Sequence, residues 1–470
     1  MGQGMSGNDQ KILVLLLGLT IIRGIIYISI FPPWLAPDEP AHFEAIRLLG
    51  QVDAWPDRLT YQASPMHPDM KASFDEFRVW QISRHVPPSG DNSQTFIQYY
   101  PPTSTASIVS TERYSILYHL LLAPVSKIST SFDIVTQVYL LRLVSLVIVV
   151  LTVGIGWSTV RRLFAGSLVY PAAVAAFLAF LPMHLHVNTS INTDAPATLL
   201  VFLFWWALLR IFFDGPSFWR TALVATIFVL AIIIKPTTIY IIPTLMAAVI
   251  IFLARRFHWK WPVSTVLLAG LIVTTFFGAI FLFQLTSTGR VLSLTPADLS
   301  RLNLDVFNVT QEHLYTYAIA LHWSFLSFWG LFGWANLHIP FAWLWWLGAF
   351  VVLSGIGVAI FVWRHILNPS SSDLRFSAPQ RDMLLALLFG AIFAMIQLYV
   401  PVLATQSLRW GPPARYIFPA LLPLSLYLFL GYRQMIPARF RQFALPVWVS
   451  ALIAYDSVTF LLVVLPSIYG

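Results

Sequence analysis

The chain has 470 residues, of which 58% are hydrophobic and only 10% are charged. Soluble globular proteins carry about a quarter charged residues, so this composition excludes a soluble fold, and it also excludes a disordered chain, which is poor in apolar residues. The net charge of +8 at pH 7 fits an excess of Lys and Arg in cytoplasmic loops rather than a nucleic-acid partner, and the lack of cysteine excludes disulfides and thiolate metal sites.

The long apolar runs predict transmembrane helices. Lipid forces backbone polar groups into helices or closed barrels, and barrel strands alternate apolar and polar residues over about ten positions. The runs here are continuously apolar, so we predict an all-α polytopic membrane protein with one integral-membrane domain over residues 1–470. About eleven spans are expected, at 11–31, 137–160, 168–187, 194–213, 219–235, 237–254, 262–285, 340–363, 382–402, 416–433 and 443–465.

The first two segments in chain order differ sharply in charge. Residues 11–31 lack a small-residue cleavage site and are long enough to span, so we interpret them as a retained first helix. Half of the 20 acidic residues lie in residues 32–112, which follow. This polar segment is too long for a simple connector, so we expect an external first loop that folds against the membrane surface.

Basic clusters between the later spans predict the orientation. They lie at Arg161–Arg162, at Arg210 and Arg220, at Arg255, Arg256 and Lys260, at Arg364, Arg375 and Arg381, and at Arg433, Arg439 and Arg441. The positive-inside rule makes their side, and the N-terminus, cytoplasmic. Two more apolar stretches, 114–128 and 314–336, do not fit this alternation. We expect them to lie in the outer interface or to re-enter it, the second within an external loop over 287–336. The alternative is thirteen spans.

Two adjacent carboxylates, Asp38 and Glu39, follow the first span within the motif Pro-Asp-Glu-Pro-Ala-His-Phe at residues 37–43. Carboxylates at the outer membrane surface, with the imidazole of His42 nearby, suit a general base or a metal ligand. The alternative is a solvated acidic pair that only marks the end of a span.

A third carboxylate, Asp194, lies at the outer end of the 194–213 span, after Asn192 and Thr193. It could share a site with Asp38 and bind an acceptor hydroxyl or a divalent cation. The alternative is helix capping, since Asn, Thr and Asp all accept bonds from free N–H groups. The nearby His184 and His186 are either metal ligands or, more often for such a pair, packing residues.

Four basic residues lie near outer ends of spans, against the positive-inside trend: Arg142, Lys235, Arg409 and Arg415. Such exceptions need a counter-charge, and a lipid phosphate supplies one. They are therefore candidate phosphate-binding residues that would stabilise a leaving group. The alternatives are side chains that reach to the interface or ion pairs within the protein.

The ordered set of motifs resembles a family of poorly characterised bacterial membrane proteins related to the GT-C glycosyltransferases, which use polyprenyl-phosphate-linked sugars. The resemblance covers nearly the whole chain, at residues 37–43, 141–143, 161–164, 192–195, 235–237, 327–334, 411–416, Pro419, Asp456 and Pro466. It implies a GT-C fold, with juxtamembrane helices in the first external loop and a site at the outer membrane face. It also implies that Asp38 acts as base or metal ligand, with Glu39 beside it. His42, and Tyr416 next to Arg415, join the expected substrate-binding residues.

The expected activity is transfer of a sugar from a polyprenyl-phosphate or pyrophosphate carrier to a glycan, lipid or protein acceptor of the cell envelope. The active site would face the exterior of the cytoplasmic (inner) membrane. Asp38 would deprotonate or orient the acceptor hydroxyl, directly or with Asp194 through Mg²⁺, Mn²⁺ or Zn²⁺. Glu39 and Asp194 would help to position the acceptor, while Arg415 and Lys235 hold the phosphate. Two other classes stay open: a flippase or transporter of lipid-linked saccharides, and a non-catalytic component of an envelope-glycan assembly complex.

Overall fold

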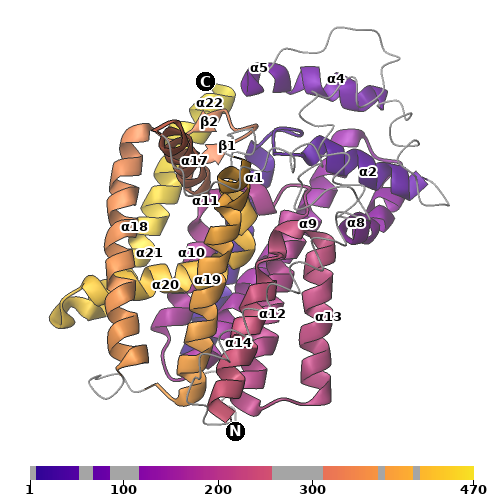
Figure 1. Cartoon of the computed structure of the whole chain (residues 1–470). Helices are drawn as coiled ribbons and strands as arrows, with labels where there is room; N and C mark the ends of the chain where they lie inside the picture. Colours follow the sequence, from indigo (N-terminus) through magenta and orange to yellow (C-terminus); the bar gives the residue numbers. More distant parts are fainter. Residues whose placement is uncertain (1–6, 52–66, 85–115, 257–310, 369–375, 406–412) are drawn as a thin grey trace.

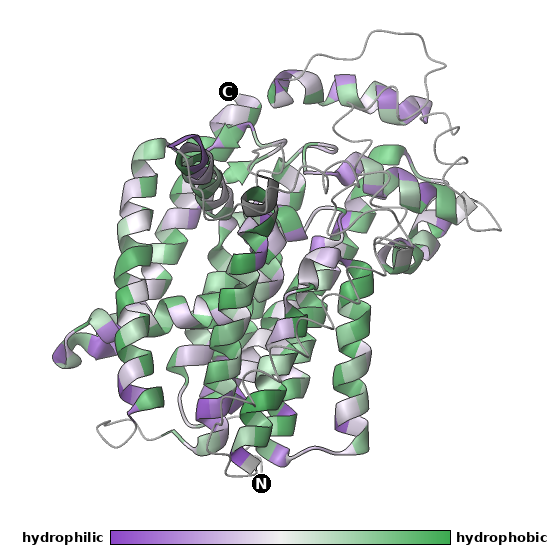
Figure 2. Ribbon diagram, viewed as in Figure 1, coloured by the Kyte–Doolittle hydropathy of each residue, from purple (hydrophilic) through white to green (hydrophobic). Residues whose placement is uncertain are grey.

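The protein is a bundle of helices that run side by side, as a computed structural model shows (Figure 1). The structure describes residues 7–51, 67–84, 116–256, 311–368, 376–405 and 413–470. Apolar residues dominate along the helices, and polar residues gather toward the helix ends and on the short helices at one end of the bundle (Figure 2). This distribution is the one expected of helices whose sides face lipid, and it agrees with the predicted class.

Eight helical segments among the described residues are long and apolar enough to cross a membrane. They are α1 (Gly7–Ile30), α9 (Ile134–Leu163), α12 (Asp194–Asp214), η2 (Pro236–Thr238) with α14 (Ile241–Arg256), α18 (Phe341–Phe361) with η3 (Val362–Leu367), α19 (Ala378–Thr405), η6 (Ala414–Ala420) with α20 (Leu421–Met435), and finally η7 (Ala438–Phe443), α21 (Ala444–Thr459), η8 (Phe460–Val464) and α22 (Leu465–Tyr469) as one. Each coincides with one of the predicted spans.

Of the other three predicted spans, one is a bent pair of helices, one is a shorter helix, and one lies outside the described residues. Residues 168–187 form α10 (Val169–Phe180) and α11 (Pro182–Asn188), which are bent by 62°. The break lies at Leu181, whose backbone is extended because a proline disfavours helix in the residue before it. Residues 219–235 form α13 (Phe218–Ile234), which at 17 residues is shorter than the eight. The predicted span 262–285 lies outside the described residues.

Shorter elements cover one end of the bundle, which we name the Asp38 end (Figure 1). They are α2 (Glu39–Gln51), α4 (Pro68–Glu76), α5 (Val79–Ser83), α8 (Ile116–Ile128), α17 (Gln311–Trp329), β1 (Leu331–Phe332) and β2 (Leu337–His338). The first three belong to the predicted first loop, 32–112. Helix α8 lies in the first of the two stretches expected not to cross, α17 overlaps the second, and neither is among the eight spanning segments.

The antiparallel pair of β1 and β2 departs from the all-helical prediction. The turn between these strands contains Gly333 and Ala335, both with a φ of +63°. Positive φ angles match the twist of a tight hairpin turn, and glycine adopts them without steric cost. This hairpin ends the predicted interfacial segment 314–336.

The opposite end of the bundle carries ion pairs between helix termini. Arg161 contacts Asp9 at 2.7 Å, and Arg255 contacts Asp382 at 2.9 Å. Arg162 pairs with Asp214. Together with Figure 1, these contacts place the start of α1 and the C-terminal ends of α9, α12 and α14 on one side of the molecule. The basic clusters of these three helices therefore share a side, as their spacing predicts.

Candidate functional site

The loop between α1 and α2 holds Asp38 in an uncommon backbone conformation. Asp38 has a φ of +60°, and Trp34 in the same loop has a φ of +72°. Asp tolerates this left-handed region, whereas it is strained for a bulky residue such as Trp. The Trp34 side chain is fully buried, packs on Phe43 and Phe74, and donates from its indole nitrogen to the Ser73 hydroxyl at 2.7 Å. Packing thus holds the loop in place.

The carboxylate of Glu39 is buried and fully hydrogen-bonded. It accepts two bonds from the Arg142 guanidinium, at 2.8 and 2.6 Å. It also accepts from the backbone N–H groups of Trp34, at 3.0 Å, and Ile191, at 3.3 Å. These four bonds fill the lone-pair positions of a carboxylate. Glu39 therefore links the loop, α9 and the chain just before α12.

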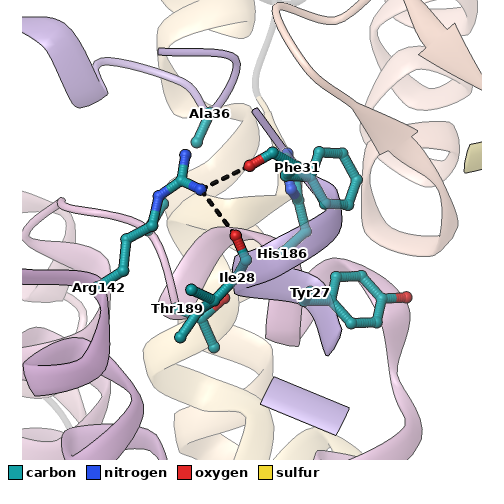
Figure 3. Close-up of a pocket in the computed structure, with 8 residues that line it drawn as sticks. Tyr27, Ile28, Phe31, Ala36, Arg142, His186 and Thr189 are labelled. Carbon is teal, nitrogen blue, oxygen red and sulfur yellow. Dashed lines mark hydrogen bonds between the residues drawn. The ribbon is translucent and has the colours of Figure 1, made fainter. Parts of the chain in front are cut away.

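The guanidinium of Arg142 uses all five of its N–H donors within the protein. Besides its two bonds to Glu39, it donates to the backbone carbonyls of Ile28, Phe31 and Pro32, at 3.1, 2.6 and 3.0 Å. Ile28 lies in the last turn of α1 and the other two residues follow the helix, so these carbonyls have no partner within it. Figure 3 shows two of these bonds. The contacts favour a positioning role for Arg142 and Glu39 over the direct substrate and catalytic contacts that the sequence suggests.

A small cavity lies beside Arg142 (Figure 3). Its lining residues are Tyr27, Ile28, Phe31, Ala36, Arg142, His186, Thr189 and Ser190. None of Asp38, Asp194, Lys235 or Arg415 lines it. The cavity therefore belongs to the joint between α1 and α9 rather than to the charged cluster described next.

Four charged side chains from four segments meet beside this joint and form what we name the charged quartet: Asp38, Asp194, Lys235 and Arg415. Arg415 Nη2 contacts Asp38 Oδ2 at 2.5 Å, and Arg415 Nη1 lies 4.0 Å from Asp194 Oδ2. Lys235 Nζ donates to Asp194 Oδ1. The Tyr416 ring contacts both cations, with its centre 5.6 Å from Lys235 Nζ and 5.6 Å from Arg415 Cζ. The structure thus brings together five of the predicted site residues.

Local sequence explains how each side chain reaches the quartet. Lys235 has an extended backbone and ends α13 because Pro236 follows it. Asp194 is the first residue of α12. Arg415 and Tyr416 lie in η6, whose first residue, Ala414, donates its backbone N–H to the Ser327 hydroxyl of α17 at 2.8 Å. All the residues of the charged quartet therefore lie at helix ends or helix breaks. A charged group at a helix end can stay near the polar interface.

Burial differs among the four groups. The Asp194 side chain is 1% exposed, whereas that of Asp38 is 33% exposed. Asp194 Oδ2 has no hydrogen-bond partner among the described residues. The cap on its helix comes instead from Asn192, whose side-chain oxygen accepts from the Asp194 N–H at 2.7 Å. The capping alternative thus applies to Asn192, and the carboxylate of Asp194 faces the two cations.

The ionisation of Asp38 is controlled by its neighbours. Burial acts to raise the pKa of this carboxyl, but the Arg415 guanidinium and other nearby positive groups outweigh burial and hold the pKa below its usual value. Asp38 is therefore a carboxylate at neutral pH. While paired with Arg415 it is also a weaker base than an isolated carboxylate.

His42 is paired with another histidine that the sequence did not single out. Its Nδ1 lies 3.0 Å from Nε2 of His119, which comes from α8, and its backbone N–H donates to the Asp38 carbonyl at 3.1 Å. Burial lowers the pKa of His42 to about 4, so the imidazole is neutral at pH 7. No sequence signal could have paired two histidines 77 positions apart.

The other two histidines of interest are held by the backbone. His184 Nδ1 lies 2.8 Å from the Leu178 carbonyl oxygen, and His186 Nε2 accepts from the Gly333 N–H at 3.2 Å. These contacts join α11 to α10 and to the turn between β1 and β2. They favour the interpretation of His184 and His186 as packing residues over that of metal ligands.

That Asp38 and Asp194 bind a metal ion stays a prediction. No group of three or more His, Asp or Glu side chains among the described residues converges as a metal site would require. Asp38 and Asp194 each have a cation as partner, Arg415 and Lys235 respectively. The quartet is thus balanced by the protein's own charges. Arg409, the remaining predicted phosphate ligand, lies outside the described residues.

Comparison with known proteins gives a family and no curated relative. No curated protein matches the chain. Residues 21–424 match a family described as predicted membrane protein (DUF2142). That stretch includes α2, the whole charged quartet and most of the spanning helices. The chain therefore belongs to the DUF2142 family of predicted membrane proteins.

Proposed function

We propose that this membrane protein is a glycosyltransferase related to the GT-C enzymes. It would transfer a sugar from a polyprenyl-phosphate-linked donor to a cell-envelope acceptor at the outer face of the cytoplasmic membrane. The observation that carries the proposal is the charged quartet. Two cations, Lys235 and Arg415, lie next to two carboxylates, Asp38 and Asp194, at one end of the helix bundle.

The chemistry needs both kinds of charge. The acceptor hydroxyl oxygen attacks the anomeric carbon, the bond from that carbon to the phosphate oxygen breaks, and the phosphate leaves with the electron pair. The hydroxyl proton passes to the carboxylate of Asp38. Lys235 and Arg415 stabilise the negative charge that grows on the phosphate, since cations fixed in a water-poor site lower the energy of a charged transition state.

The distribution of charge supports an outward-facing site. The basic ends of α9 and α14 lie opposite to the Asp38 end, and by the positive-inside rule that opposite end would be cytoplasmic. The quartet would then face the exterior. A flippase would need polar residues through the middle of the bilayer, whereas the members of the quartet gather at one end.

The test is turnover by the purified protein in liposomes. Polyprenyl-phosphate-linked hexoses extracted from the native membrane serve as donors, an extract of the native cell envelope supplies the acceptors, and release of free polyprenyl phosphate is measured by mass spectrometry. Wild type should release it, and Asp38→Asn should reduce the rate by about 10²–10⁴-fold, which is the contribution of a general base. Asp69→Asn removes an exposed carboxylate from α4 at the same end and should retain the wild-type rate. An active Asp38→Asn variant would refute the assignment of the base.

A further inference from the structure

The cations proposed to hold phosphate already have carboxylate partners. Arg415 pairs with Asp38, and Lys235 pairs with Asp194. The formal charges of the quartet sum to zero, so the site offers no net attraction to an anion unless one carboxylate gives way. A phosphate that binds these cations therefore competes with the carboxylates for their N–H donors, and its binding is favoured when it replaces one of them.

Asp38 is the carboxylate that can move away from the cations. Its side chain is 33% exposed, its backbone belongs to a loop, and its one described ion-pair partner is Arg415. Asp194, in contrast, is 1% exposed, starts α12, and keeps Lys235 as a partner. Moving Asp38 outward exposes it further to solvent, whereas moving Asp194 would carry a buried charge away from its counter-ion at a high cost in free energy.

Arg415 keeps a second carboxylate within reach. Its Nη1 lies 4.0 Å from Asp194 Oδ2, which is beyond hydrogen-bond distance, and that oxygen has no hydrogen-bond partner among the described residues. When Arg415 loses Asp38 it can therefore gain a bond to Asp194 and still present its Nη2 donors to a ligand. The guanidinium fork suits this dual contact, because it binds two oxyanions with separate edges.

We propose that the Asp38 carboxylate competes with the phosphate of an anionic lipid for the Arg415 guanidinium. The phosphate displaces this carboxylate when it binds, so phosphate binding and release of Asp38 are one event. The inference rests on the proposed function, because it gives the displaced group the role of base. A phosphodiester and a carboxylate each carry one negative charge, so the exchange keeps the charge of the site constant. Once released, Asp38 loses the cation that weakens it as a base.

The experiment compares binding of an anionic lipid with and without the competitor. Farnesyl phosphate is titrated into the full chain in detergent by isothermal calorimetry, with farnesol as the neutral control and inorganic phosphate as the control for a free anion. Wild type is compared with Asp38→Asn, Asp38→Gly, Asp69→Asn, Arg415→Gln and the double variant that combines Arg415→Gln with Asp38→Asn. Asn and Gly both tolerate the positive φ of residue 38, so these substitutions keep the loop conformation.

The proposal predicts that loss of Asp38 tightens binding. Asp38→Asn and Asp38→Gly should each bind farnesyl phosphate about tenfold more tightly than wild type, because a charge-assisted bond no longer competes. Asp69→Asn should bind as wild type, which excludes a general effect of net charge. The double variant should bind no more tightly than Arg415→Gln alone, because the competition needs the guanidinium. Tighter binding of farnesyl phosphate than of inorganic phosphate would identify the lipid as the source of the anion.

Two contrary results are distinguishable. If farnesyl phosphate binds wild type and Asp38→Asn with equal affinity, or binds the variant more weakly, Asp38 is no competitor and the inference fails while the proposed phosphate site stands. If neither wild type nor any variant binds farnesyl phosphate, the proposed function fails together with the inference.

Discussion

The side chains of Glu39 and Arg142 form two parallel hydrogen bonds although 103 positions separate them in the chain. The same guanidinium binds the carbonyl groups at the end of α1, so one side chain joins the end of the first helix to the start of α2. Asp38 is the residue directly before Glu39. The pair therefore determines where the proposed base lies.

Breaking this pair should destabilise the protein strongly. Glu39→Gln leaves the Arg142 guanidinium, which is 2% exposed, without a counter-charge. Removing one partner of a buried pair costs about 3–5 kcal/mol. Thermal unfolding in detergent should show a large fall in Tm. The matched control is Arg162→Gln, which breaks a half-exposed pair with Asp214 and should cost at most about 1 kcal/mol. Equal losses in the two variants would contradict the buried-pair argument.

The pair of Lys235 and Asp194 allows stability and activity to be separated. Lys235→Met leaves the buried Asp194 carboxylate without its closest cation and should destabilise the fold. Adding Asp194→Asn removes the unpaired charge, so the double variant should regain about 1–3 kcal/mol of unfolding free energy over Lys235→Met. If Lys235 serves the phosphate, the double variant should still fail to release polyprenyl phosphate. Recovered turnover would assign Lys235 a structural role only.

Close packing of α18 against α20 gives a prediction on the bundle itself. A Cβ added to Gly431 would lie 1.9 Å from the Ser354 carbonyl oxygen, so Gly431→Ala must push the two helices apart. Overpacking of this kind costs about 1–3 kcal/mol. Gly355 lies on α18 as well, with no atom within 4 Å of an added Cβ, so Gly355→Ala should retain wild-type stability. Thermal unfolding of the two variants tests the contact, and an undisturbed Gly431→Ala protein would contradict it.

Stability should depend on pH through His42. In the unfolded chain this imidazole has its ordinary pKa of 6.5, and burial in the fold lowers the pKa to about 4. Between these values the unfolded state binds more protons, so the unfolding free energy should fall as pH drops from about 6.5 to about 4. His42→Gln should make Tm depend less on pH between about 4 and 6.5. Any pH dependence that comes from His119 should remain. A profile of unchanged slope would show that His42 is not buried as a neutral group.

Much of the fold followed from local sequence. Insertion of a helix into lipid depends on the summed hydropathy of about twenty neighbouring residues, so eight predicted spans, the broken one and α13 could be located from the chain alone. The same holds for helix ends, since Pro182 and Pro236 break helices through the residue before them. That Arg161, Arg162 and Arg255 lie on one side of the molecule also followed, because each lies at the end of a predicted span.

Composition and motifs also nominated Asp38, Asp194, Lys235, Arg415 and Tyr416, but not the partner of each. That Glu39 binds Arg142 while its neighbour Asp38 binds Arg415, 377 positions away, depends on the rotation and depth of each helix in the packed bundle. Hydropathy does not specify either quantity. Tertiary packing alone therefore decided which charges became a fixed joint and which remained at the proposed site, because a buried charge is stable only where the fold brings it a counter-charge.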